Sequence, residues 1–169
     1  MIKRGTAVGL ITALLCLAGE GWAEEKEPSA IIEMGGAAEW GLRDGGQSFG
    51  PAVAIDVTPL KNWLEIEAGV ASQFGDGRTD WNTDLVFKKP FTLSPTVEVE
   101  VGGGPAWMHA TGGGKTADSL GGEAVVEFQF WPWPNRNYGW YLEPSYGYDF
   151  GSGHAQSFGL TVGLLIAIP

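Results

Sequence analysis

A regular alternation of apolar with small or acidic side chains runs through most of this chain and restricts the folds open to it. The alternation is clearest in "SFGLTVGLLIAI", residues 157–168, where nearly every second residue is a large apolar one. A period of two places successive side chains on opposite faces of a β-strand. From residue 29 onward, no stretch has apolar residues at helical spacing over three turns. The sequence therefore predicts an all-β domain.

Turn-forming Gly, Pro, Asn and Asp residues divide the alternating region into eight runs. The runs cover residues 29–43, 49–60, 64–74, 80–91, 96–111, 119–131, 138–150 and 156–168. Most are longer than an ordinary strand of about five or six residues, and close to the length with which a tilted strand crosses a bilayer. Tight connections alternate with Gly-rich ones such as "GGGKTAD", as in a barrel with turns at one end and loops at the other.

The two faces of these runs differ in a way that decides which face points inward. One face carries apolar residues such as Val53, Val99, Phe128 and Leu160, whereas the other carries Gly and Ala with carboxylates between them. Small residues fit the narrow interior of a closed eight-stranded barrel. Closure also pairs every backbone group inside lipid. We therefore predict an eight-stranded antiparallel up-and-down transmembrane β-barrel with its apolar face outward.

Aromatic residues lie near both ends of the predicted strands, as expected for girdles at the two membrane interfaces. The residues near the tight turns are Trp63, Phe91, Phe130 and Trp131. Those near the Gly-rich loops are Trp40, Trp81, Trp107, Tyr148 and Phe150. The alternative is a soluble periplasmic barrel that binds a small apolar ligand, with the tryptophans filling a soluble core.

The same alternation directs many carboxylates into the barrel. The predicted cluster in the lumen consists of Glu33, Glu65, Glu67, Glu98, Glu100, Glu127 and Glu143, with Lys88 and Arg43 as the inward cations. Further acids predicted to face inward are Glu39, Asp56, Asp84, Glu123 and Asp149. Burial and mutual repulsion disfavour so many charges in a narrow channel. We expect several of these groups to be protonated, bridged by water or sharing a bound cation near neutral pH.

The first 23 residues are predicted to be a secretory signal peptide. Lys3 and Arg4 precede a short apolar run, and Gly21 and Ala23 are the small residues that signal peptidase requires, which places the cut between Ala23 and Glu24. The remaining 24–169 would form one barrel domain without cysteine. It carries 8 basic and 19 acidic residues, so a nucleic-acid partner is not expected.

The sequence offers little for catalysis or for a cofactor. With two histidines in the chain, no multi-histidine metal site is expected, although Asp and Glu oxygens could hold calcium weakly. His109, Thr111 and Glu123 could form a nucleophile, base and acid set, but the alternation turns Glu123 inward and His109 outward. His154 and Ser157 are close in sequence. We expect no enzyme activity and no cofactor.

The eight runs and the last strand resemble the small outer-membrane barrels of the OmpA and OmpX type. Gly163, Ile166 and Ile168 match the glycine and apolar spacing that serves such barrels as an assembly signal, and Pro169 stands where the family usually has an aromatic residue. The resemblance implies an outer-membrane location, periplasmic termini and insertion by the barrel-assembly machinery.

The final hairpin is also similar to that of the PagL-type lipid A deacylases, barrels that remove an acyl chain from lipopolysaccharide. That family has a His-x-Ser motif there, whereas this chain has Tyr146 and Tyr148 at about those positions. The resemblance implies a shared fold without the shared chemistry.

The function predicted from the sequence is that of a monomeric, non-enzymatic outer-membrane barrel with a filled acidic lumen. Its expected partners are outer-membrane lipid and lipopolysaccharide. The main alternative is a lipid A deacylase-like hydrolase, which would require a histidine and a hydroxyl about 3 Å apart on the lipid-facing wall.

Overall fold

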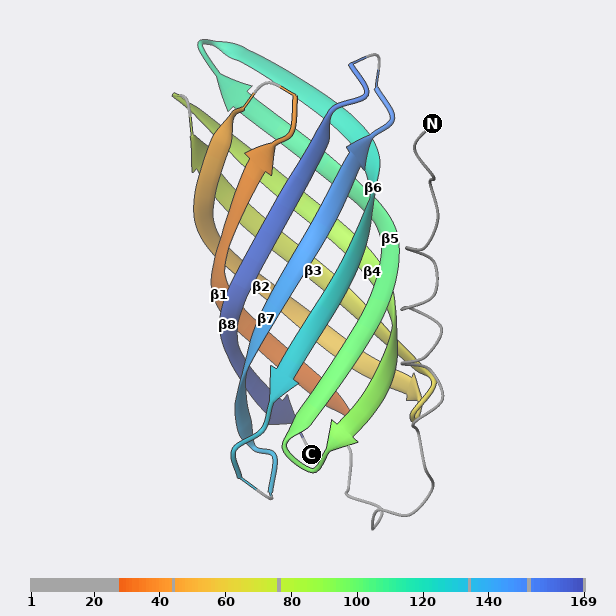
Figure 1. Cartoon of the computed structure of the whole chain (residues 1–169). Helices are drawn as coiled ribbons and strands as arrows, with labels where there is room; N and C mark the ends of the chain where they lie inside the picture. Colours follow the sequence, from red (N-terminus) through yellow and green to blue (C-terminus); the bar gives the residue numbers. More distant parts are fainter. Residues whose placement is uncertain (1–27, 44, 76, 134, 152, 169) are drawn as a thin grey trace, which may run out of the picture.

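The computed structural model describes residues 28–168 apart from residues 44, 76, 134 and 152. The predicted signal peptide and its cleavage site at Ala23 and Glu24 lie outside the described residues. Eight strands make up the fold (Figure 1): β1 Ala30–Gly41, β2 Gln47–Leu60, β3 Leu64–Gly75, β4 Arg78–Ser94, β5 Val97–Gly112, β6 Lys115–Phe130, β7 Tyr138–Asp149 and β8 Gln156–Ile168. The described part of the chain has no helix of the length and apolar character needed to cross a membrane.

The strands form a closed antiparallel barrel in which each pairs with the next along the chain and β8 returns to β1. Strands β1 and β8 close the barrel, and their register has no shift from Ala30 opposite Ile168 to Gly41 opposite Ser157. Closure leaves no sheet edge with unpaired backbone groups. The predicted eight-stranded up-and-down barrel is confirmed.

The end of the barrel with the Gly-rich connections differs from the prediction at the longest hairpin. Residues 112–118 were expected to be a loop, but β5 and β6 continue through most of them, with Thr111 opposite Thr116 and Ala110 opposite Ala117. The turn is made by Gly113 and Gly114, whose φ angles of 58° and 73° suit glycine. The loop prediction was wrong because two glycines suffice for the turn, and the flanking polar residues remain paired.

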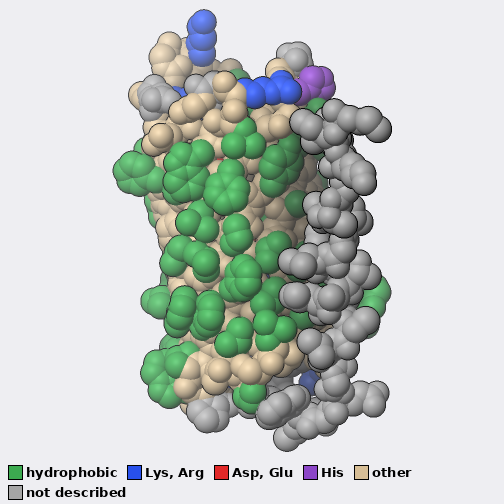
Figure 2. Space-filling model, in the orientation of Figure 1, with side chains coloured by type: hydrophobic (Ala, Val, Ile, Leu, Met, Phe, Trp, Pro, Cys, Tyr) green, Lys and Arg blue, Asp and Glu red, His purple; other side chains and the backbone are tan. Residues whose placement is uncertain are grey.

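The outer wall is apolar between its two ends. Figure 2 shows hydrophobic side chains spread over the wall, with the Lys and Arg side chains near its two ends, most of those in view at the upper rim. Leu164 is 60% exposed and Val53 50%, values that would be unusual for side chains of a soluble core. The predicted outward orientation of the apolar face is therefore observed.

Trp131 does not belong to the aromatic girdle in which the sequence placed it. It is 1% exposed and packs inside the barrel with Ile31, Tyr141 and Leu165. Residue 131 continues the inward alternation of β6 past its end, and its backbone N–H donates to Thr96 O at 2.8 Å. The barrel thus contains an apolar plug, defined by these four residues, at the end with the tight turns.

Candidate functional site

Lys88 lies at the centre of the buried charges. It belongs to β4, is 1% exposed, and its Nζ lies 3.2 Å from Asp56, 2.8 Å from Glu67 and 3.1 Å from Glu100. It also contacts Glu127. These five residues, from β2, β3, β4, β5 and β6, are called the Lys88 cluster below. One ammonium group therefore joins five of the eight strands across the lumen.

A glycine on the neighbouring strand makes room for this lysine. Gly102 pairs with Lys88 across β4 and β5. A Cβ atom at Gly102 would lie 2.8 Å from Lys88 Cγ and 2.4 Å from Phe87 O, closer than van der Waals contact allows. The glycines of the inner face thus provide space for the long polar side chains opposite them.

A second ion pair lies nearer the tight-turn end. Arg136, in the connection between β6 and β7, is 6% exposed and its Nη1 donates to Glu98 Oε2 at 2.9 Å. Its Nη2 donates to Pro95 O at 3.2 Å. Sequence reasoning missed Arg136 as an inward cation because alternation assigns no face to a residue in a turn.

Hydrogen bonds connect these charges to the apolar plug. Gln129 Nε2 donates to Glu100 Oε1 at 2.8 Å, and Trp131 Nε1 donates to Gln129 Oε1 at 3.0 Å. Glu65, 6% exposed, accepts a bond of 3.3 Å from Thr58 Oγ1. Polar and apolar groups together fill this half of the barrel.

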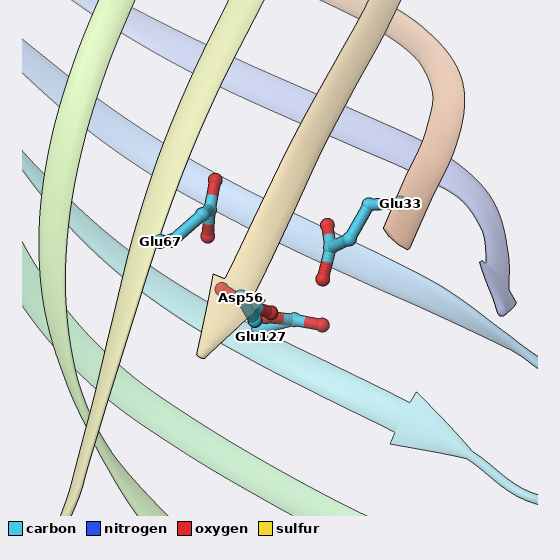
Figure 3. A group of neighbouring side chains, drawn as sticks. All are labelled: Glu33, Asp56, Glu67 and Glu127. Atoms are coloured by element: carbon cyan, nitrogen blue, oxygen red, sulfur yellow. The ribbon is translucent and has the colours of Figure 1, made fainter. Parts of the chain in front are cut away.

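Glu33 and Glu143 are buried carboxylates that make no ion pair with a lysine or arginine among the described residues. They are 2% and 8% exposed, and Glu33 Oε1 and Glu143 Oε2 have no hydrogen-bond partner among the described residues. Figure 3 shows the Glu33 side chain reaching from β1 toward Asp56 and Glu127. One oxygen from each of Glu33, Asp56, Glu67 and Glu127 lies within 4.8 Å of the others.

A cavity of about 60 Å³, called the chamber below, adjoins the Lys88 cluster through Glu67. Its acidic lining residues are Glu33, Glu39, Glu67, Asp84, Glu123 and Glu143. Among the described residues that line it, none is a lysine or arginine. The Asp84 carboxylate lies over its paired residue Gly69, where a Cβ atom would come within 2.5 Å of Asp84 Oδ1.

A larger cavity of about 590 Å³, the vestibule, lies at the end with the Gly-rich connections. It shares Glu39, Asn82 and Glu123 with the chamber, so the two spaces are adjacent. Arg43 lines this vestibule, is exposed, and donates to Gly153 O at 3.5 Å. The prediction that Arg43 belongs to the buried carboxylate cluster was therefore wrong: the residue follows the end of β1 and lies at the mouth.

A separate polar group lies on the outer wall near the β5–β6 turn. His109 Nδ1 is 2.7 Å from Asp118 Oδ1, and His109 Nε2 is 3.4 Å from Thr111 Oγ1. The acid beside His109 is thus Asp118, whereas Glu123 lines the chamber. Asp118 directly opposes His109 in the hairpin register, which the predicted loop over residues 112–118 concealed.

The other histidine offers a different arrangement. His154 Nδ1 lies 3.1 Å from Tyr148 Oη, and the two rings stack with centroids 5.9 Å apart. Within the part of the chain that the structure describes, no acid is paired with His154, and a tyrosine hydroxyl and an imidazole alone do not make a nucleophile, base and acid set.

Solved structures show the fold to be one that bacterial outer-membrane proteins use. Neisserial surface protein A matches with a TM-score of 0.69 at 15% identity, over 83% of this chain and 97% of that one. OprG from Pseudomonas aeruginosa gives 0.63 at 11% identity over 84% and 96%. Ail, the attachment invasion locus protein of Yersinia pestis, gives 0.59 at 15% identity over 83% and 99%. No family model and no curated protein sequence matches the chain.

Proposed function

We propose that this protein is a non-enzymatic barrel of the outer membrane whose filled, acidic lumen does not conduct, and that its role is in the structure or surface contacts of the envelope. The Lys88 cluster carries this proposal. A buried ammonium that touches carboxylates from four neighbouring strands holds the lumen closed, because opening a path would break several buried ion pairs at once. Eight strands also leave an interior about wide enough for side chains alone.

The proposed location in the outer membrane follows from the apolar outer wall, and the proposed partners follow from that wall and from the net negative charge. The apolar wall would contact outer-membrane lipid and lipopolysaccharide, after export by the signal peptide and insertion by the barrel-assembly machinery. A monomer satisfies this arrangement, since the closed barrel has no edge to pair with another chain. The formal net charge of −10 argues against a nucleic-acid partner.

Fractionation and conductance measurements test this proposal together. We expect the protein to pellet with membranes in the absence of detergent and to co-migrate with lipopolysaccharide in a density gradient. Purified protein in planar bilayers should give no steady open level under conditions in which a general porin, measured in parallel, conducts. A protein that stays in the supernatant would instead support the soluble periplasmic barrel, and a stable open state would contradict the closed lumen.

The second candidate function is a lipid A deacylase-like hydrolase on the outer wall, favoured by the geometry of Thr111, His109 and Asp118. Their separations of 3.4 Å and 2.7 Å place a hydroxyl, a base and an orienting acid in sequence, near the looser limit of such contacts. Thr111 Oγ1 would attack an ester carbonyl while His109 takes the hydroxyl proton and passes it to the leaving alcohol. Water would then release the acyl group from Thr111.

Mass spectrometry of lipid A distinguishes the two functions. If the hydrolase hypothesis holds, cells producing the wild-type protein lose an acyl chain from lipid A, and His109→Ala and Thr111→Ala abolish that loss. Thr116→Ala is the matched control, because Thr116 is the exposed residue opposite Thr111 in the hairpin. Unchanged lipid A in all four strains would support the non-enzymatic role.

A further inference from the structure

We propose that the vestibule binds a short, uncharged oligosaccharide, whose hydroxyl groups bond to Asp80 and Asn82 on β4. This ligand site rests on the proposed function, because it requires that the end with the Gly-rich connections faces outward. It gives the surface contacts of the envelope a class of ligand.

The vestibule has the size of a small-molecule site and a smooth wall on one side. Its volume of about 590 Å³ lies within the range of about 300–1,000 Å³ for such sites. On β5 and β6, Ala110 lies opposite Ala117 and Ala106 lies opposite Gly121, and all four residues line the vestibule. These small residues leave the space open, so a ring-shaped ligand can lie flat against this wall.

The side chain of Asp80 is the observation that points to a ligand. This residue lines the vestibule and is 6% exposed, and its Oδ2 accepts a bond of 2.8 Å from Arg78 Nε. Its Oδ1 is buried and has no hydrogen-bond partner among the described residues. A buried carboxylate oxygen without a partner is costly. A ligand hydroxyl would supply the missing bond to a carboxylate that Arg78 already holds in place.

Asn82 extends the polar row along β4. It is the next inward residue after Asp80, is half-buried and lines the same vestibule. Its amide offers two donors and an acceptor, whereas an ionised Asp80 only accepts. In the pairing of β4 with β5, Asp80 lies opposite Ala110 and Asn82 lies opposite Met108. A polar row beside an apolar wall matches a sugar ring, which has hydroxyl groups around its edge and C–H groups on its faces.

The charges around the vestibule disfavour a strongly charged ligand of either sign. Its charged lining residues are the acids Glu39, Asp80, Glu123 and Asp149 and the bases Arg43 and Arg78. An anion would enter a space with more carboxylates than guanidinium groups, and like charges repel. A cation would meet the two arginines, both of which are exposed. An uncharged ligand avoids both penalties and still donates charge-assisted hydrogen bonds to the carboxylates.

The lining also argues against an apolar ligand and against a bare metal ion. Among its described residues, the large apolar or aromatic side chains are those of Met108 and Tyr148, whereas pockets for apolar ligands are lined mostly by such groups. The described acidic groups whose oxygens converge within 4.8 Å belong to the lumen around Lys88 and not to the vestibule. A molecule with many hydroxyl groups and no net charge is the class that remains.

A glycan array tests the proposal, with neutral, sialylated and sulfated oligosaccharides as probes. The folded protein is applied in a polyoxyethylene detergent, which has no sugar headgroup to compete for the vestibule. We expect stronger binding to neutral oligosaccharides than to their sialylated or sulfated counterparts. Calorimetric titration with the strongest neutral binder then gives a Kd for the wild type and for each variant.

Two variants act on the site in different ways. Asp80→Ala should weaken binding by about tenfold or more, because it removes a hydrogen bond to a charged group, and Arg78 stays solvated since its side chain is 56% exposed. Ala117→Leu narrows the vestibule, leaves every polar group in place and should also weaken binding. Thr83→Ala is the matched control: this exposed residue follows Asn82 on β4 but faces outward, so its Kd should equal that of the wild type. Heat-modified mobility on gels verifies that each variant is folded.

Three results would overturn the ligand site. They are a lack of binding to every neutral oligosaccharide, a preference for the sialylated or sulfated ones, and an unaltered Kd in folded Asp80→Ala. None of them changes the expected membrane fractionation or bilayer conductance, so a failed ligand site is distinguished from a failed proposed function.

Discussion

The two halves of the barrel interior are built from the same alternating strands but differ in how far side chains fill the lumen. In the half with the tight turns, long side chains interlock: Lys88, Trp131 and Gln129 are each 1% exposed. In the half with the Gly-rich connections, Gly, Ala and Ser make up most of the lining of a vestibule of about 590 Å³. In the packed half one lysine joins five strands, whereas the open half has pairwise contacts, such as the bond of 3.0 Å that Ser48 Oγ on β2 donates to Gln73 Oε1 on β3.

This difference shows how a barrel can combine stability with accessible space. Backbone pairing closes the barrel around its whole circumference, so side chains are free to fill one half and leave the other open. The chamber lies at the boundary, where packed carboxylates give way to small residues. Substitutions should therefore have effects that depend on the half in which they fall.

Removing the charge of Lys88 should give the largest effect. In Lys88→Met, the carboxylates of Asp56, Glu67, Glu100 and Glu127 lose their shared partner. An uncompensated buried charge costs about 3–5 kcal/mol, so the free energy of unfolding should fall by that amount. Urea unfolding in lipid vesicles, followed by tryptophan fluorescence, measures the change.

Lys89→Met is the control for that experiment, because residue 89 points the opposite way on the same strand. Its Nζ lies 5.7 Å from the centre of the Phe91 ring and it is half-buried, so its loss should cost at most about 1 kcal/mol. Equal effects of the two variants would contradict the central role of the Lys88 cluster.

The sequence predicted the packed half through its alternation, and failed where alternation carries no information. The inward direction of Glu100 and Glu127 could be predicted, because successive side chains of a strand alternate between two faces. Arg136 lies in the turn between β6 and β7, so alternation could not predict its ion pair with Glu98. Arg43 lies two residues past the end of β1, and alternation could not show that it stands at the mouth of the vestibule, away from the buried carboxylates.

The sequence also did not fix the register between neighbouring strands or the depth of each side chain in the barrel. The pairing of His109 with Asp118 depends on where the β5–β6 turn lies, and a run of three glycines allows several turns. Trp131 was given to the membrane interface because tryptophans gather there, although its position two residues after Gln129 marks it as inward. Composition suggested one location and alternation the other, and alternation was correct.

A methyl group added at Gly102 should have the next largest effect. In Gly102→Ala the new Cβ would lie 2.4 Å from Phe87 O and 2.8 Å from Lys88 Cγ. Since backbone must move as well as side chain, we expect a loss of about 1–3 kcal/mol, typical of overpacking. The same urea titration measures it.

Gly69→Ala provides the comparison within the chamber. Its three nearest neighbours are atoms of the Asp84 carboxylate, with Oδ1 at 2.5 Å, and this side chain can turn into the cavity. We expect a smaller loss, below about 1 kcal/mol. A larger loss for Gly69→Ala than for Gly102→Ala would mean that the chamber is as tightly packed as the Lys88 cluster.

A large side chain introduced in the vestibule should change the free energy of unfolding least. Such a substitution therefore shows where the packed half ends. Ala117 lines the vestibule and is exposed, so leucine at this position would extend into open space, and stability should change by no more than about 0.5 kcal/mol. Ala71, which is 8% exposed and lines the chamber, is the matched position in the narrower part. Ala71→Leu should cost about 1–3 kcal/mol, and similar values for the two variants in the urea titration would remove the distinction between the halves.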